Sequence, residues 1–308
     1  MDAGQVTQRF AIHIEAADRG PRRRDLLGLA AAAALLGTAC TTTPTVSPTE
    51  GMAISKTPLV GKFVWRDLMT DDPALVKPFY AALFGWEFVE TKSLGRPYTL
   101  IRSGGQFIGG IAKGQRRVVH ESNAQWLSFL SVADVDRAAQ ATAAAGGAVL
   151  VAPFDVAKVG RAAVVTDPQG APLGLLRAAF GDPADPPAPV LHRFLWTEGL
   201  VREPVAAAKF YADLIGYEVL VHDQGDKPFR VLKLLGRERA GIMRMPFKDV
   251  QPIWLPSVMV ADPVASAERA AKLGGRVLVA PRMDVRSGSV ALIVDPGGAL
   301  LALQRWPS

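Results

Sequence analysis

Cysteine and clustered positive charge are both scarce in this sequence. Cys40 is the single cysteine among 308 residues, which excludes an internal disulfide. Lysine and arginine leave a net charge of only +6 and form no run with interleaved aromatic residues, so a nucleic-acid partner is not expected. There is no serine-centred nucleophile elbow, and Gly104–Gly110 is not followed by a helix, as a phosphate-binding loop would require.

Long apolar runs are also absent, apart from a short one near the N-terminus. Leu26–Ala39 is an apolar run behind three arginines, Arg22–Arg24, and is too short to span a bilayer comfortably. Such a run behind positive charge is typical of an export signal, and Arg23–Leu27 resembles the twin-arginine motif. The alternative is a buried alanine-rich helix in a cytoplasmic protein.

The apolar run ends in Gly37–Cys40, which resembles a lipoprotein cleavage box. We therefore predict a signal over residues 1–40, lipidation of Cys40, and anchoring of the exported protein to a membrane of the cell envelope. Residues 41–58 are rich in Thr, Pro and Ser and would form a flexible linker between the anchor and the folded part.

The rest of the chain is an internal repeat. The segment Lys77–Glu90, KPFYAALFGWEFVE, returns in the second half as Ala208–Val221, AKFYADLIGYEVLV. Two DPxG turns, which begin at Asp167 and Asp295, are separated by nearly the same interval as these two segments. A register kept over this length indicates two homologous domains joined in tandem, over residues 59–180 and 190–308. Between them, residues 181–189 are rich in Pro and Gly and are predicted to be an irregular linker.

Each half contains two modules of one strand, one helix and three further strands. In the first module, Phe63–Met69 alternates like a strand, and Asp72 and Pro73 then begin a helix that Gly85 ends. Three strands separated by glycine and polar turns follow. The sequence therefore predicts an α+β fold of four βαβββ modules, with two cup-shaped mixed sheets and the helices outside.

Paired βαβββ modules with these junctions resemble the vicinal oxygen chelate superfamily, which contains glyoxalases, bleomycin-resistance proteins and extradiol dioxygenases. The motifs that carry the resemblance are FY…LFGWE, FY…LIGYE, VADVD, VADPV, DPQG and DPGG, between about residues 60 and 306. The resemblance implies a ligand inside each cup, and in many members a divalent metal held by His and Glu. It does not imply one reaction, because the superfamily includes isomerases, lyases, dioxygenases and simple binders.

The positions that the resemblance assigns to metal ligands hold no ligand side chains. The first-strand positions and the start of the later strands carry tryptophan, and the two glutamate positions carry small residues: Trp65, Trp196, Trp126, Trp254, Gly174 and Ala302. His192 is the one histidine with a plausible place on a strand. We therefore predict no metal and no other cofactor, while a divalent metal on atypical ligands stays open as the alternative.

Aromatic residues followed by a carboxylate occupy the strands where the metal would be expected. Alternation predicts that Phe63, Trp65, Asp67 and Met69 share one face, and that Phe194, Trp196 and Glu198 share the equivalent face. The functional interpretation is an aromatic pocket with one acid in each half, for an apolar or planar ligand that could carry positive charge. The alternative is that the tryptophans are core residues and the acids lie at a solvated rim.

These patterns favour a metal-free protein that binds a small molecule in the cell envelope as a monomer or homodimer. The predicted ligand-binding residues are Trp65, Asp67, Trp126, Trp196, Glu198 and Trp254, with Asp67 and Glu198 as the candidate catalytic residues. The alternative is an active lyase, isomerase or dioxygenase of the superfamily. A third interpretation is an interaction module whose cups are filled by its own side chains.

Overall fold

The computed structural model describes residues 52–114, 124–222, 229–247 and 250–306. The predicted signal and Cys40 lie outside these residues, as does most of the predicted linker over 41–58. In the part of the chain that is described, no helix is long and apolar enough to cross a membrane.

The first half forms two βαβββ modules in succession. Its elements are β1 (Phe63–Thr70), α2 (Pro73–Phe84), β2 (Glu87–Ser93), β3 (Arg96–Ser103), β4 (Gln106–Lys113), β5 (Gln125–Ser131), α3 (Val135–Ala144), β6 (Ala148–Val156), β7 (Gly160–Thr166) and β8 (Pro172–Ala178). The second half repeats this order. Its elements are β9 (Phe194–Val201), α4 (Pro204–Ile215), β10 (Glu218–His222), β11 (Phe229–Leu234), β12 (Arg237–Arg244), β13 (Ile253–Met259), α5 (Pro263–Lys272), β14 (Arg276–Val279), the 3₁₀ turn η1 (Arg286–Gly288), β15 (Val290–Val294) and β16 (Leu300–Gln304).

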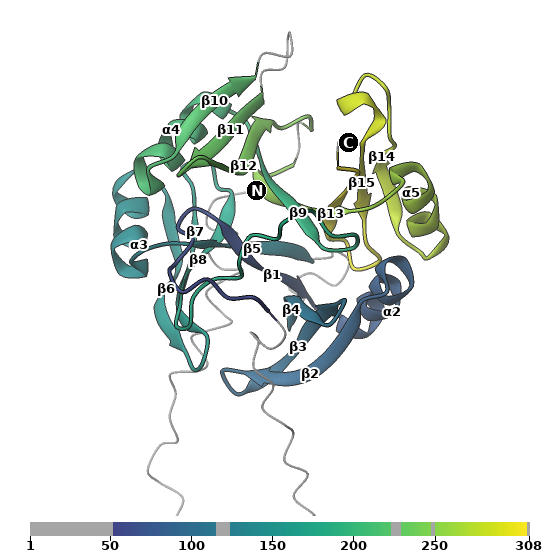
Figure 1. Cartoon of the computed structure of the whole chain (residues 1–308), viewed down its shortest axis with the longest axis horizontal. Helices are drawn as coiled ribbons and strands as arrows, with labels where there is room; N and C mark the ends of the chain where they lie inside the picture. Colours follow the sequence, from purple (N-terminus) through teal and green to yellow (C-terminus); the bar gives the residue numbers. More distant parts are fainter. Residues whose placement is uncertain (1–51, 115–123, 223–228, 248–249, 307–308) are drawn as a thin grey trace, which may run out of the picture.

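Each half contributes one mixed sheet of eight strands. The first sheet has the order β2-β3-β4-β1-β5-β8-β7-β6 and the second the order β10-β11-β12-β9-β13-β16-β15-β14. Two pairs in each sheet are parallel, β1 with β4 and β5 with β8, then β9 with β12 and β13 with β16. The first strands of the two modules lie side by side at the centre, as Figure 1 shows. The predicted α+β fold of paired βαβββ modules is confirmed.

Helix boundaries follow from local chemistry. The Asp72 side chain accepts a hydrogen bond from the backbone N–H of Leu75 at 3.1 Å, and Pro73 opens helix α2 where no N–H is needed. Gly85 ends the same helix with φ 69°, a left-handed conformation that favours glycine. Asp134 and Asp262 cap α3 and α5 in the same way, through backbone N–H groups of the first turn.

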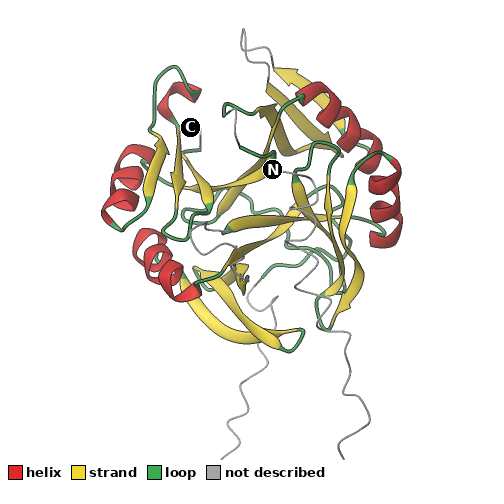
Figure 2. Cartoon of the chain, turned by 180° about the vertical axis from the view of Figure 1, so that it is seen from behind, coloured by secondary structure: helices red, strands yellow, loops and turns green. Residues whose placement is uncertain are grey.

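The two largest hydrophobic cores among the described residues do not follow the two halves, whereas three smaller clusters each lie within one half. One core joins α2 and β1 of the first half to α5, β15 and β16 of the second, and the other joins α3 and β8 to α4 and β12. Helix α2 accordingly contacts α5, and α3 contacts α4, so the helices lie in two pairs at opposite sides of the molecule (Figure 2). Each of these two cores therefore requires residues from both halves.

A buried polar chain crosses each core. The Tyr80 hydroxyl in α2 donates to Asp295 Oδ2 at 2.8 Å, and Trp126 Nε1 donates to the Tyr80 oxygen at 3.2 Å. The second core repeats the arrangement with the equivalent residues of the repeat. There Tyr211 donates to Asp167 at 3.1 Å and Trp254 donates to Tyr211 at 2.7 Å. Each DPxG aspartate thus caps its own turn and also binds the helix of the opposite half.

The segments before and between the halves are irregular but fixed to the folded body. Ile54 forms an isolated bridge with Pro183, and Asp182 Oδ2 accepts hydrogen bonds from Leu59 N and Ser131 Oγ, both at 2.6 Å. Asp185 pairs with Lys62 at 3.0 Å. The described end of the predicted linker over 41–58 is thus joined to the segment between the halves by backbone pairing near residue 54.

Candidate functional site

A bulge decides which residues of β1 face the cup. Phe63 pairs with Leu130 and Trp65 pairs with Phe129, so the register shifts between them. Phe63 therefore packs in the helix-side core against Trp254, with 4.9 Å between ring centroids. The prediction that Phe63 shares the face of Trp65 and Asp67 is wrong, because one extra residue reverses the alternation.

The same irregularity recurs in β9 of the second half. The register with β13 shifts between Ser257 and Val258, the partners of Trp196 and Phe194. Phe194 packs against the core that contains Trp126, with 5.3 Å between ring centroids. The predicted shared face of Phe194 with Trp196 and Glu198 is therefore also wrong, for the same reason.

Two side chains of the first sheet converge on one carboxylate oxygen. Asp67 Oδ1 accepts a hydrogen bond from Trp65 Nε1 at 2.8 Å and another from the Tyr98 hydroxyl at 2.6 Å. Trp65 Nε1 also lies 3.1 Å from the Tyr98 oxygen. We call this cluster of Trp65, Asp67 and Tyr98 the Asp67 site. All three side chains are half-buried, and Asp67 Oδ2 has no hydrogen-bond partner among the described residues.

Burial makes Asp67 a weaker acid than an ordinary aspartate. Desolvation raises the pKa of its carboxyl to about 6, against the opposing effect of the hydrogen bonds from Tyr98 and Trp65. No ion pair neutralises Asp67 within the described chain. Burial and the nearby Asp67 charge raise the pKa of Tyr98 well above its usual value, so its hydroxyl stays a donor at neutral pH. The site thus combines a titratable carboxylate with two neutral donors that fix one of its oxygens.

A glycine makes room for the aromatic ring at this site. Gly110 pairs with Asp67 across β1 and β4, and a Cβ at Gly110 would lie 1.8 Å from the Tyr98 hydroxyl oxygen. No other residue could occupy this position without displacing Tyr98 from Asp67. The glycine is therefore part of the site.

In the first sheet, apolar side chains occupy the positions to which the family resemblance assigns metal ligands. Trp65 pairs with Phe129, which pairs in turn with Gly174, the residue at the expected glutamate position. A Cβ at Gly174 would lie 2.1 Å from the Phe129 ring, so the ring occupies the space that a longer side chain would need. In the second sheet the matching row is Trp196, Ser257 and Ala302. These residues do not fit the ligand set of a divalent metal.

The described residues contain no group of three or more His, Cys, Asp or Glu side chains that could hold a metal ion. His192 lies at the helix-side core, with its ring centroid 5.9 Å from that of Phe84. Its carbonyl accepts a hydrogen bond from Trp86 Nε1 at 2.7 Å. His192, which the sequence places on a strand, thus lies in the turn before β9 and next to the helix-side core.

Trp126 and Trp254 lie on the helix side of their sheets. They are 6% and 2% exposed and donate to Tyr80 and Tyr211 within the two cores. The strand partner of Trp65 is Phe129, which lies further along β5 than Trp126. The structure therefore brings Trp65 together with Asp67, and Trp196 with Glu198, but keeps Trp126 and Trp254 apart from them.

The second sheet contains a related cluster with one added charge. Trp196, Glu198, Phe229 and Gly241 stand at the positions of the repeat that Trp65, Asp67, Tyr98 and Gly110 hold in the first half. We call this set, with Arg286, the Glu198 site. Arg286 Nη2 donates to Glu198 Oε1, and the Arg286 Cζ atom lies 5.0 Å from the centroid of the Phe229 ring. A Cβ at Gly241 would lie 2.6 Å from Phe229 and 3.0 Å from Trp196 Nε1.

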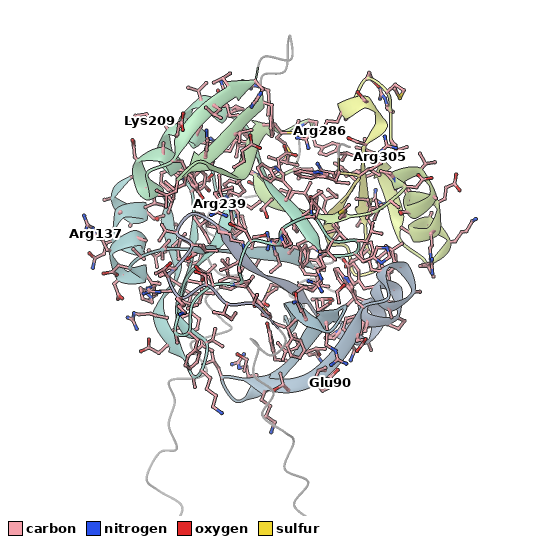
Figure 3. The ribbon with its side chains drawn as sticks, viewed as in Figure 1. Glu90, Arg137, Lys209, Arg239, Arg286 and Arg305 are labelled. Atoms are coloured by element: carbon pink, nitrogen blue, oxygen red, sulfur yellow. The ribbon has the colours of Figure 1, made fainter. Side chains whose placement is uncertain are left out.

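Arg286 lies between the β10–β12 strands and the β14–β15 strands, as Figure 3 shows. Glu198 is 9% exposed, and desolvation raises its pKa while the Arg286 charge opposes the rise. The Glu198 site is thus an internally neutralised version of the Asp67 site.

Several residues in or beside these clusters were not predicted from the sequence, among them Gly110 and Gly241. Tyr98 and Phe229 could have been found from their shared position in the repeat. Phe129 required the strand register, and Arg286 required the path of the connection between β14 and β15.

Comparison with known proteins agrees with this fold. A glyoxalase-like domain family matches residues 64–176, which extend from β1 to β8. The relative named "Putative glyoxylase CFP32" of Mycobacterium tuberculosis (strain CDC 1551 / Oshkosh) is 30% identical over 247 residues, covering 78% of this chain and 92% of that protein. "Anthracycline biosynthesis protein DnrV" of Streptomyces peucetius is 29% identical over 262 residues, covering 78% and 91%. The chain therefore belongs to the glyoxalase-like family.

Solved structures of two enzyme classes share the fold. A Mn(II)-bound glyoxalase from Novosphingobium aromaticivorans superposes with a TM-score of 0.55 at 16% identity, covering 80% of this chain and 82% of that one. An extradiol ring-cleaving dioxygenase from B. fuscum gives a TM-score of 0.55 at 16% identity, covering 83% and 75%. At this identity the likeness concerns the fold alone.

Proposed function

We propose that this chain is a metal-independent member of the glyoxalase-like family that binds a small planar molecule at the Asp67 site. The observation that carries the proposal is the arrangement at Asp67. Trp65 and Tyr98 hold one carboxylate oxygen, and the second oxygen has no partner among the described residues. A ligand with a flat apolar body and a hydrogen-bond donor matches such a cluster.

Two further observations support binding without a metal. Phe129 fills the space above Gly174, where a ligand glutamate would otherwise extend. Trp65 occupies the position on the first strand that the resemblance assigns to a metal ligand. Its indole Nε1 donates a hydrogen bond to Asp67 Oδ1 at 2.8 Å. Holding a divalent ion there would require displacing two aromatic rings from packed positions.

The test is a ligand screen with the purified chain, followed by tryptophan fluorescence and including anthracyclines because of the relative that carries their name. Elemental analysis should find no stoichiometric divalent metal, and dialysis against a chelator should leave ligand affinity unchanged. Trp65→Ala should weaken binding at least tenfold, about 1.4 kcal/mol, through loss of one ring and one donor. Trp306→Ala, which removes a tryptophan 47% exposed near the C-terminus, is the matched control.

A result of one bound metal per chain, with binding lost on chelation, would contradict the proposal. So would unchanged affinity in Trp65→Ala for a ligand that quenches fluorescence in the parent chain. Thermal melts of both variants beside the parent distinguish a lost contact from a lost fold.

A second candidate function is proton transfer by Asp67, favoured by its pKa of about 6 and by an Oδ2 atom that has no hydrogen-bond partner in the part of the chain that the structure describes. If Asp67 acts as a general base, the rate should rise with pH through about 6, since the ionised form is the active one. Asp67→Asn should abolish the reaction, while binding of a neutral planar ligand is preserved because the shape of the side chain is kept. A rate that is flat between pH 5 and pH 8 would exclude this role.

We also propose export to the cell envelope with a lipid on Cys40, on the basis of the arginines and apolar run that precede it. Mass spectrometry of the membrane fraction should find a modified N-terminus at Cys40, and Cys40→Ala should release the protein from membranes. A cytoplasmic product that retains Arg22–Arg24 would contradict export.

A further inference from the structure

The two halves of this chain contain equivalent sites that are built from similar side chains. Trp65, Asp67, Tyr98 and Gly110 of the first sheet recur as Trp196, Glu198, Phe229 and Gly241. In both sheets the acid pairs with the glycine on the neighbouring parallel strand, Asp67 with Gly110 and Glu198 with Gly241. The equivalence therefore holds in the strand register as well as in the sequence.

The Glu198 site contains a cation supplied by the chain itself. The guanidinium of Arg286 is hydrogen-bonded to Glu198 and lies over the ring of Phe229, with 5.0 Å from Cζ to the ring centroid. A planar cation that contacts a carboxylate and an aromatic face at once receives both charge pairing and cation–π attraction.

The residue equivalent to Arg286 does not reach the Asp67 site. Lys158 precedes the Asp167 turn by the same interval as Arg286 precedes the Asp295 turn, and Lys158 is exposed. There the chain forms a tight hairpin, because β6 continues to Val156 and β7 begins at Gly160. In the second half β14 ends at Val279, and the longer connection carries Arg286 inward.

The inward path in the second half includes unfavourable backbone geometry. Arg286 and Ser287 have φ values of 47° and 50°, left-handed conformations that side chains with a Cβ rarely adopt. The equivalent Lys158, which is exposed, is also left-handed with φ 62°, so this conformation belongs to the turn in both halves. The Glu198 pair and the Phe229 ring fix where the Arg286 side chain lies.

We propose that the Asp67 site binds a planar cation, such as an amidinium, a guanidinium or an aromatic ammonium, in the position that the Arg286 guanidinium takes at Glu198. The inference rests on the proposed function and names its ligand class. It follows from one difference between the sites. Among the residues that the structure describes, Asp67 has hydrogen bonds only to the neutral donors Trp65 and Tyr98, whereas Glu198 has a cationic partner. A half-buried carboxylate without a counter-charge favours a ligand that supplies one.

The experiment compares three probes of one shape and different charge: benzamidine, benzamide and benzoate. Equilibrium dialysis with the full chain should give one bound benzamidine per chain, with benzamide at least tenfold weaker and benzoate weaker still. Asp67→Asn, which keeps the shape of the side chain, should reduce benzamidine affinity at least tenfold and leave benzamide affinity within threefold.

Removing the internal cation should expose the second site. Arg286→Ala should raise the benzamidine stoichiometry from one to two, and adding Glu198→Gln should return it to one. Arg286→Met, which retains an apolar stem over Phe229, is the second variant in case the alanine form does not fold. A stoichiometry that stays at one in both Arg286 variants, with intact melts, would overturn the inference.

The outcomes separate this inference from the proposed function. A neutral planar compound that binds in a Trp65-dependent manner, without competition from benzamidine, would contradict the proposed ligand class. Small-molecule binding at the Asp67 site would still be supported. If benzamide and benzoate bind as tightly as benzamidine, the same conclusion follows. If no compound in the screen responds to Trp65→Ala, both proposals fail together.

Discussion

Trp254→Ala should destabilise the protein by about 3–5 kcal/mol, the usual range when a large buried aromatic side chain is truncated. Trp254 is 2% exposed and packs against Phe63 of the other half and Tyr211 of its own, each with 4.9 Å between ring centroids. Its removal leaves a cavity between the halves. It also removes the indole donor that lies 2.7 Å from the Tyr211 oxygen. Both effects lower the free energy of unfolding.

Two variants separate these effects from a general sensitivity to tryptophan loss. Trp254→Phe keeps most of the ring volume but loses the donor, and should cost about 1–2 kcal/mol. Trp65→Ala truncates a half-buried tryptophan at the Asp67 site and should cost about 1–2 kcal/mol, since less apolar area leaves contact. Urea unfolding, with calorimetry to check for a single transition, gives all three values. A Trp254→Ala value no larger than that of Trp65→Ala would show that the packed core has been misassigned.

The features that could be predicted from the sequence depend on residues close together in the chain or on the spacing of the repeat. Helix ends were predictable because Asp72, Pro73 and Gly85 act within one turn of chain, through hydrogen bonds and backbone conformations that only neighbouring residues influence. The repeat was predictable because the two halves keep the same spacing between their motifs. Trp65 and Asp67 were selected together because residues two apart share a strand face.

The features that were predicted wrongly or missed depend on strand register and loop path, which the local sequence pattern does not determine. Alternation placed Phe63 beside Trp65, but a bulge turned Phe63 into the helix-side core. Trp126 stands near the start of its strand, whereas the residue opposite Trp65 is Phe129. Arg286 and Lys158 occupy equivalent positions, yet only Arg286 enters a site, because the paths of their connections differ.

The arrangement of the modules has the largest consequence for folding. Sequence similarity divides the chain into 59–180 and 190–308, and the two sheets follow that division. The two largest cores do not, since Tyr80 of the first half binds Asp295 of the second, and Tyr211 of the second binds Asp167 of the first. Arg66 also reaches across, from β1 to the Thr197 hydroxyl at 2.9 Å, and its burial lowers its pKa to about 10.

We therefore expect that residues 59–180, produced alone, will not form a folded monomer. The apolar side of α2, which carries Val76, Phe79 and Tyr80, packs against α5 and the last strands of the second half and would be exposed without them. Because the halves are homologous, a second copy could take the place of the missing half, so the soluble product should be a dimer. Size-exclusion chromatography with light scattering, together with near-ultraviolet circular dichroism, measures both properties.

Two controls make this prediction decisive. Producing residues 59–180 and 190–308 together should restore a one-to-one complex with the melting behaviour of the intact chain. Cleaving the intact protein at a protease site inserted after Ala188 should leave the two pieces associated, because the cross-half cores do not depend on chain continuity there. A folded monomer of residues 59–180, as stable as the whole chain, would mean that the α2–α5 contact contributes little. The first sheet and its own helices would then be sufficient to fold around the Asp67 site.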